Sequence, residues 1–258
     1  MKYWELKEGV MEFYNKVAPE YDSSSKLRIT RVIEKCEEAI ICSLLRGKRF
    51  QKSIDLGAGT GRYTRLLTCT SKHTIALDFS FNMLKTLREK LRHHSNLDIV
   101  CADIEHLPFR NHVFSFALST LTLDHIPNIT SALNEIFRVL NTGGELIISS
   151  FNEKMLEKYR KEYSIPKDMI DFETENIPRT YIFEKGHTPS EFVKLFEKVG
   201  FREVKYVSCC LWPPITLITP KYVRKIFLKH YGPVFERLFG MFNVFKRNAL
   251  LYIYLVKV

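Results

Sequence analysis

The chain has 258 residues, a length that suits one large α/β domain with insertions and a substantial core. No apolar run is long enough to span a membrane, and no signal-peptide core opens the sequence, so we expect a cytoplasmic protein. The six cysteines form no C-x-x-C pair, which argues against disulfides and against a bound metal. The net charge of +10 leaves nucleic-acid and anionic-membrane partners open.

The N-terminal part is predicted to be helical, because residues 27–45 repeat apolar side chains at the spacing of one helix face. An apolar run then ends at Asp55, and Gly57, Gly59 and Gly61 follow at alternate positions. Glycines so placed permit positive φ angles and let the backbone approach a ligand closely. The residues after them have a helical pattern, so we expect free helical N–H groups to face the same ligand.

The spacing of this glycine loop separates two classes of cofactor. A dinucleotide fingerprint needs G-x-G-x-x-G, but here Arg62 follows Gly61, and the third glycine comes one residue early. A carboxylate at Asp55 would repel a pyrophosphate, whereas it suits a ligand that carries a cationic amino group. The loop therefore favours S-adenosylmethionine over a dinucleotide.

Two further predicted strands also end in carboxylates. Residues 74–78 end at Asp78, and residues 97–103 place Asp103 just past an apolar run, in which Cys101 is expected to be a small core residue. Asp78 can accept hydrogen bonds from ribose hydroxyls, and Asp103 could accept one from the amine of an adenine. Three carboxylates behind three apolar runs predict a ligand at one edge of a parallel sheet.

The remaining segments complete an α/β fold with a Rossmann-like, mostly parallel sheet of seven strands and helices on both faces. After a helix capped by Ser80, we expect a strand over 113–119, a helix over 129–140, a strand over 145–151, a helix from the capping box Thr188–Glu191 to 199, and strands over 201–211 and 249–258. Residues 152–186 and 212–247 do not belong to this sheet. The second of them is rich in aromatic and basic residues.

Four motifs in order resemble the class I S-adenosylmethionine-dependent methyltransferases, in the branch that includes quinone and sterol methyltransferases. They are DLGAGTG at 55–61, LDFS at 77–80, ADIEHLPF at 102–109 and EIFRVLNTGG at 135–144. Asn141-Thr142 departs from the usual Lys-Pro or Arg-Pro, which should alter only a turn. The resemblance implies a helical cap over the cofactor (1–48), a core (49–211, with insertion 152–186), a helical substrate lid (212–247) and a final core strand (248–258).

The resemblance also implies S-adenosyl-L-methionine as cofactor, S-adenosyl-L-homocysteine (SAH) as product, and no metal. The residues expected to bind the cofactor are Asp55, Gly57, Ala58, Gly59, Thr60, Gly61, Asp78, Phe79, Met83, Asp103, Ile104, Ser119, Thr120, Tyr14 and Tyr21. For the two tyrosines, plain packing of the N-terminal helix is the alternative.

Methyl transfer asks mainly for alignment and desolvation of the reactants, and alignment can lower a barrier by ~7–11 kcal/mol. A general base is needed only where the acceptor must lose a proton. Asp124 and His125 near the fourth strand tip are the candidates. Members of the family that this sequence resembles often carry a histidine at the position of His125. The alternative to a catalytic role there is a structural one.

The first functional interpretation is a methyltransferase for a small, apolar acceptor such as a quinone, lipid or other metabolite. The second is a tRNA or RNA methyltransferase, and the third is a regulator that binds S-adenosylmethionine without turnover. Residues 212–247 could accordingly contact RNA, rest on an anionic membrane, or only pack on the core. No motif distinguishes O, N and C acceptors or predicts an oligomeric state.

Overall fold

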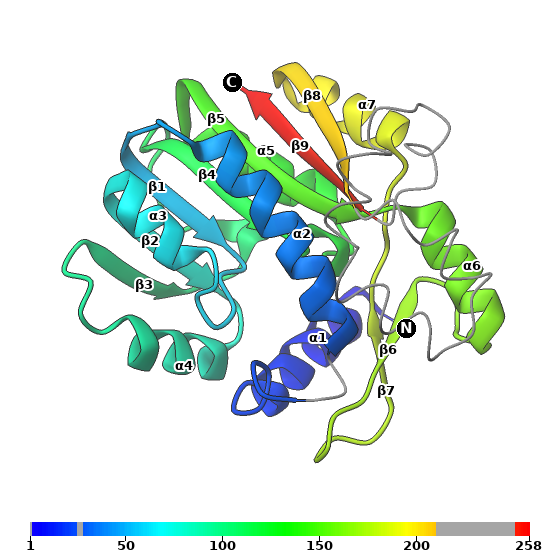
Figure 1. Cartoon of the computed structure of the whole chain (residues 1–258). Helices are drawn as coiled ribbons and strands as arrows, with labels where there is room; N and C mark the ends of the chain where they lie inside the picture. Colours follow the sequence, from blue (N-terminus) through cyan, green and yellow to red (C-terminus); the bar gives the residue numbers. More distant parts are fainter. Residues whose placement is uncertain (1, 25–27, 210–250) are drawn as a thin grey trace.

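A seven-stranded sheet forms the centre of the molecule (Figure 1). The computed structural model of the chain describes residues 2–24, 28–209 and 251–258. The strand order is β3-β2-β1-β4-β5-β9-β8; the pairs among β1 to β5 are parallel, and β9 is antiparallel to both of its neighbours. The strands are β1 (Phe50–Leu56), β2 (Ser71–Asp78), β3 (Leu97–Cys101), β4 (Phe114–Thr120), β5 (Leu140–Phe151), β8 (Arg202–Cys209) and β9 (Leu251–Lys257).

Helices cover both faces of the sheet, as the sequence predicts. Successive residues of a buried strand point to opposite faces, so Ala117 of β4 joins the core cluster under α5 and α7, whereas Phe116 and Leu118 join the cluster under α2 and α3. The α-helices are α1 (Tyr3–Val17), α2 (Arg28–Leu45), α3 (Thr64–Thr70), α4 (Phe81–Leu91), α5 (Ile129–Val139), α6 (Glu153–Tyr163) and α7 (Pro189–Val199). Among the described residues no helix combines the length and apolarity needed to cross a bilayer.

The helix starts follow from local capping. The Ser80 hydroxyl accepts the backbone N–H of Met83 at the start of α4, as predicted. At α7, the Glu191 carboxylate accepts the backbone N–H of Thr188 at 2.8 Å, a contact of the predicted capping box. These caps fix where two of the covering helices begin.

Two strand predictions need correction. β3 ends at Cys101, whose side chain is exposed rather than in the core, because β3 is an edge strand with neighbours on one side only. β5 begins at Leu140 rather than at 145, since Leu140 already pairs with Phe114 before the register shifts to Glu145 opposite Phe116. β8 is described over Arg202–Cys209, and positions 210–211 of the predicted strand lie outside the described residues, as do residues 212–247.

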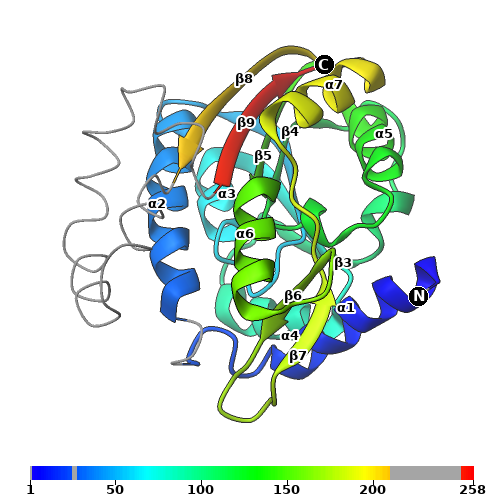
Figure 2. The same cartoon turned by 90° about the vertical axis from the view of Figure 1, so that its right-hand side faces the viewer.

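The insertion 152–186 contains α6 and a two-stranded hairpin, β6 (Met169–Phe172) and β7 (Thr180–Phe183). Figure 2 shows this hairpin reaching from α6 towards α1, and β7 and α1 are in direct contact. The Asn15 side-chain oxygen of α1 accepts hydrogen bonds from the Ser80 hydroxyl and the Asn82 amide of α4. The N-terminal helix and the insertion therefore meet over the carboxyl ends of the central strands.

Candidate functional site

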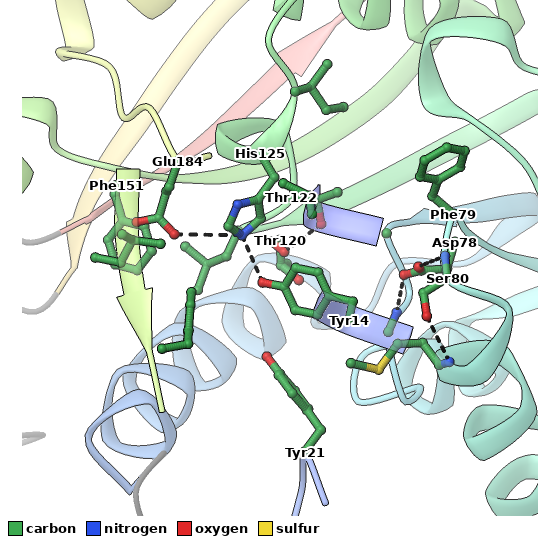
Figure 3. Close-up of a pocket in the computed structure, with 18 of the residues that line it drawn as sticks. Tyr14, Tyr21, Asp78, Phe79, Ser80, Thr120, Thr122, His125, Phe151 and Glu184 are labelled. Carbon is green, nitrogen blue, oxygen red and sulfur yellow. Dashed lines mark hydrogen bonds and ion pairs between the residues drawn. The ribbon is translucent and has the colours of Figure 1, made fainter. Parts of the chain in front are cut away.

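A cavity of about 820 Å³ lies at the carboxyl ends of the central strands, between the sheet, α1, α6 and the β6–β7 hairpin (Figure 3). Its wall includes the three carboxylates that the sequence places at strand tips, Asp55, Asp78 and Asp103. Carboxyl ends of parallel strands are the usual ligand position in open α/β sheets. The topology thus brings three separated motifs into one site.

The glycine loop after β1 closes one end of this cavity. Gly57 has φ +75°, and a Cβ there would lie 2.2 Å from the Thr122 side chain, so only glycine fits. Gly59 also has positive φ, but a Cβ there would meet no atom within 4 Å, because this part of the loop faces open space. The backbone around Gly59 can therefore approach a ligand directly.

Three amides of the glycine loop are bonded within the protein. The N–H groups of Gly57 and Ala58 both donate to the Leu77 carbonyl, at 2.8 and 2.9 Å. The Gly59 N–H donates to Asp78 Oδ2 at 2.8 Å. These bonds fix the loop against β2. The three amides are therefore not free to donate to a ligand, and the loop contributes a surface without side chains that a ligand can approach closely.

Asp78 holds the glycine loop and the start of α4 together. In addition to Gly59, its carboxylate accepts the Ser80 N–H at 2.8 Å (Figure 3). Burial nevertheless raises the pKa of Asp78, although the backbone donors act in the opposite direction. The two backbone N–H groups orient the Asp78 carboxylate. A ligand in the cavity that carries a hydrogen-bond donor or a positive charge would stabilise its ionised form further.

Asp55 lies deeper, with 1% of its surface exposed, and its Oδ2 accepts the Thr64 hydroxyl at 2.7 Å. Burial, and then the nearby negative charge of Asp78, raise the pKa of Asp55 to about 7. A buried carboxylate and a half-buried one lining the same cavity favour a cationic ligand, because its charge offsets their desolvation and mutual repulsion. An ammonium and a sulfonium on one molecule, as in S-adenosylmethionine, fit this arrangement.

Asp103 already has a partner on the N-terminal helix. Its Oδ2 pairs with Lys7 Nζ, and its Oδ1 accepts the Glu105 N–H at 3.0 Å. Lys7 is buried, lines the cavity and also contacts the Glu105 carboxylate at 2.5 Å. Sequence reasoning missed Lys7, because a single lysine in an amphipathic helix gives no signal of a buried ion pair.

Tyr14 and His125 form a hydrogen-bonded pair in the cavity wall. The Tyr14 hydroxyl lies 2.9 Å from His125 Nε2, and His125 Nδ1 lies 2.8 Å from the Phe183 carbonyl (Figure 3). Since a carbonyl can only accept, Nδ1 carries the proton and Nε2 accepts from Tyr14. Burial lowers the pKa of His125 to about 4, so the imidazole is neutral at pH 7.

Asp124 has a different environment from its neighbour His125. Its carboxylate accepts the Ser150 hydroxyl at 2.6 Å and the Phe151 N–H at 2.8 Å, and it is not among the lining residues. The Asp124 carbonyl accepts the Lys185 N–H at 2.8 Å. The residue links β5 to the end of the insertion, and burial raises its pKa to about 7. This geometry fits a structural role.

Comparison with known proteins agrees with this geometry. Residues 54–148 match the family model described as "Methyltransferase domain". An uncharacterised protein of Methanocaldococcus jannaschii is 32% identical over 254 residues, which cover 96% of this chain and 98% of the relative. The ubiquinone/menaquinone biosynthesis C-methyltransferase UbiE of Brucella abortus is 29% identical over 219 residues, 78% of this chain and 81% of the relative. The chain belongs to the class I S-adenosylmethionine-dependent methyltransferases.

The fold comparison is consistent with that family. The solved DhpI–SAH complex has a TM-score of 0.65 at 14% identity, and the match covers 98% of this chain and 96% of the other. This likeness confirms the predicted Rossmann-like fold with its seven-stranded sheet and flanking helices. The protein is an S-adenosylmethionine-dependent methyltransferase, and the third interpretation, a regulator without turnover, is set aside.

Most residues expected to bind the cofactor of this methyltransferase line the cavity. They are Tyr14, Tyr21, Asp55, Gly57, Ala58, Gly59, Thr60, Asp78, Phe79, Met83, Asp103, Ile104 and Thr120. Gly61 and Ser119 are not among the lining residues. A Cβ at Gly61 would lie 2.8 Å from Leu87 Cγ, so this glycine permits packing of the loop against α4. Ser119 is fully buried within β4.

The other end of the methyltransferase cavity comes largely from the insertion. Its apolar and aromatic lining residues are Phe151, Met155, Leu156, Tyr159, Tyr163, Ile170 and Phe172, and Glu184 lies beside them. The sequence indicates the insertion as a whole as a pocket-forming segment. It gives no signal for these individual residues, because their positions depend on how α6 and the hairpin pack.

Proposed function

We propose that this methyltransferase acts on a small, partly apolar acceptor, in the class of quinones, lipids or other metabolites. The observation that supports this most is the cavity itself, which places the cofactor carboxylates at one end and the apolar side chains of the insertion at the other. Its volume of about 820 Å³ lies within the ~300–1,000 Å³ of small-molecule sites. In this proposal, residues 1–48 cover the cofactor, and the segments 152–186 and 212–247 select the acceptor.

The cofactor end follows from the residues already described. Asp55 would hold the cationic amino-acid part of the cofactor, Asp78 the ribose hydroxyls, and the backbone at Gly59 would approach it closely. When bound, S-adenosylmethionine supplies a methyl carbon that is activated by a positively charged sulfur. The enzyme's own contribution is to align the acceptor with that carbon and to exclude water.

Tyr14 and His125 give a route for a proton, where the acceptor must lose one. The acceptor's proton passes to the Tyr14 oxygen while the Tyr14 proton passes to His125 Nε2, 2.9 Å away. The imidazolium that forms keeps its Nδ1–H bond to the Phe183 carbonyl, and Glu184 Oε2 lies 3.7 Å from Nε2. We therefore include His125, and not Asp124, as the residue that would act in catalysis.

The charge of the cavity wall disfavours the RNA interpretation. Its carboxylates are Glu34, Glu37, Asp55, Asp78, Asp103, Glu162, Asp171, Glu173 and Glu184, and its cations are Lys7, Arg62 and Lys158. A polyphosphate backbone needs the opposite balance. We therefore do not propose RNA as the acceptor, and the experiment below includes it as an alternative outcome.

The proposal is tested by transfer of a radiolabelled methyl group from S-adenosylmethionine into a cell extract. Afterwards the extract is split into nuclease-sensitive, organic-soluble, small polar and protein fractions. Label in either small-molecule fraction supports the proposal. Label that nuclease removes would instead identify an RNA methyltransferase, and label in the protein fraction would reject a small acceptor.

A further inference from the structure

Glu184 is a buried carboxyl group to which no described residue donates a hydrogen bond. It is 2% exposed and lines the cavity, yet within the described part of the chain its Oε1 has no partner. Its Oε2 has His125 Nε2 as a neighbour at 3.7 Å, which is beyond hydrogen-bond distance. In the tautomer fixed by the Phe183 carbonyl, that nitrogen also carries no proton to donate.

The nearest buried cation does not fill this role. Arg160 donates from Nε to the Met169 carbonyl, from one terminal nitrogen to Glu153, and from the other to the main-chain oxygen of Glu184. These N–H groups donate to other acceptors and not to the Glu184 carboxyl. Burial and the negative charge of Asp124 raise the pKa of Glu184 well above its usual range.

The backbone holds Glu184 in this position. Its N–H donates to the Asp168 carbonyl at 3.1 Å, and its main-chain oxygen accepts from Arg160, directly after β7 ends. Figure 3 shows the side chain pointing from the hairpin towards His125 and Tyr14. An unpaired buried polar group destabilises the fold, so a residue fixed here suggests a partner that the described part of the chain does not supply.

We propose that Glu184 recognises the acceptor, and that the acceptor carries a protonated amine. This inference rests on the proposed function and narrows its substrate class. An ammonium supplies several donors and a positive charge, so it satisfies the unpaired carboxyl more fully than a hydroxyl does. The excess of carboxylates over cations around the cavity favours the same sign of charge.

The surroundings of Glu184 fit an amine attached to an apolar or aromatic skeleton. In the view of Figure 3 the Tyr14 ring lies between Glu184 and Asp78, and an aromatic face attracts a cation. Phe151, Met155 and Phe172 line the same cavity and would contact the apolar part. The acceptor class is therefore a small aralkyl or alkyl amine.

The test compares the parent enzyme with Glu184→Gln and with Glu157→Gln, a matched loss of one carboxylate on the exposed surface of α6 outside the cavity. Each protein methylates the cell extract, and the labelled small molecules are separated by cation exchange into amines and neutral compounds. The same proteins are then assayed with tyramine, whose phenol oxygen can accept the methyl group while its ammonium binds Glu184, and with tyrosol, its neutral isostere. Affinity for SAH is measured in parallel.

We expect the small-molecule label to be retained by the cation exchanger. Glu184→Gln should lower kcat/KM for amines at least about tenfold, mainly through KM, because a charge-assisted hydrogen bond is lost. SAH affinity should stay at the parent value, and Glu157→Gln should behave as the parent throughout. Because Gln removes an unpaired buried acid, the Tm of Glu184→Gln should not fall, which separates recognition from a structural role.

Two results would overturn the inference and are distinguishable from failure of the proposed function. Label confined to neutral small molecules, with Glu184→Gln as active as the parent, rejects the amine but keeps a small acceptor. Label only in RNA or protein rejects both. If Glu184→Gln does not fold, Glu184→Asp is used, since it keeps the charge but withdraws it by one methylene; unchanged kcat/KM for amines in that variant would also reject the proposal.

Discussion

At the two ends of the cavity, the residues that hydrogen-bond to one another are separated by different numbers of positions along the chain. At the cofactor end, Asp55 is bonded to Thr64, nine positions away, and Asp78 to Gly59 and Ser80, 19 and two positions away. At the acceptor end, Tyr14 and His125 are 111 positions apart, and His125 and Phe183 are 58 apart. A site made of neighbouring residues leaves a motif in the sequence, whereas a site made of distant residues does not.

The largest effect is expected from the cofactor end. Asp55→Ala should weaken SAH binding more than about 100-fold, roughly 3 kcal/mol, because it removes the buried carboxylate expected to hold the ammonium. Isothermal titration calorimetry measures this directly. Asp98→Ala, which removes an exposed aspartate of β3, is the matched control and should bind as the parent does. Affinity within about threefold of the parent in Asp55→Ala would place the cofactor elsewhere.

Substitutions at the acceptor end should lower the rate of methyl transfer and leave the affinity for the cofactor unchanged. His125→Ala is expected to lower kcat about 100-fold with SAH affinity unchanged, because a general base contributes ~10²–10⁴-fold. Tyr14→Phe should have a similar effect, and the double variant should be little worse than either single one, since the two residues act as one pair. Initial rates of label transfer provide the measurement. Additive losses would mean that the two side chains act independently.

A pH titration of SAH binding tests the charge state of Asp55 at the cofactor end. With a pKa of about 7, Asp55 is uncharged below pH 7 and must lose its proton to hold a cation. SAH binding should therefore strengthen about tenfold between pH 6 and pH 7.5. Asp55→Asn should bind weakly with a flat profile. A parent profile that is flat, or that weakens as pH rises, would contradict the assignment.

The same contrast explains how much could be predicted from sequence. The positions of the central strands along the chain, the glycine loop and the three carboxylates follow from apolar runs that end in Asp or Gly, because these features are local. Lys7 and Glu184 could not be found in this way, since nothing near either residue in the chain marks it as buried. Their environment arises only when α1 and the β6–β7 hairpin pack over the sheet.

Substitution of Lys7 should have the smallest effect on SAH binding, because Lys7 holds helix α1 over the site. Lys7→Met keeps the apolar stem but leaves Asp103 and Glu105 without their shared cation. The N-terminal turns of α1 should then detach more often, with SAH affinity about threefold lower and faster hydrogen exchange over residues 3–13. Lys16→Met, an exposed position on the same helix, serves as the control.

A second substitution determines whether the ion pair is the cause. If unpaired carboxylates loosen α1, then adding Glu105→Gln to Lys7→Met should recover part of the hydrogen-exchange protection, because one of the two negative charges is gone. If α1 instead depends on the volume of the lysine stem, Lys7→Met should leave the hydrogen-exchange protection unchanged, and adding Glu105→Gln should change nothing more, because glutamine still accepts the Tyr3 hydroxyl. The N-terminal cap is thus attached to the core by charge or by packing, and the two variants give a different pattern in each case.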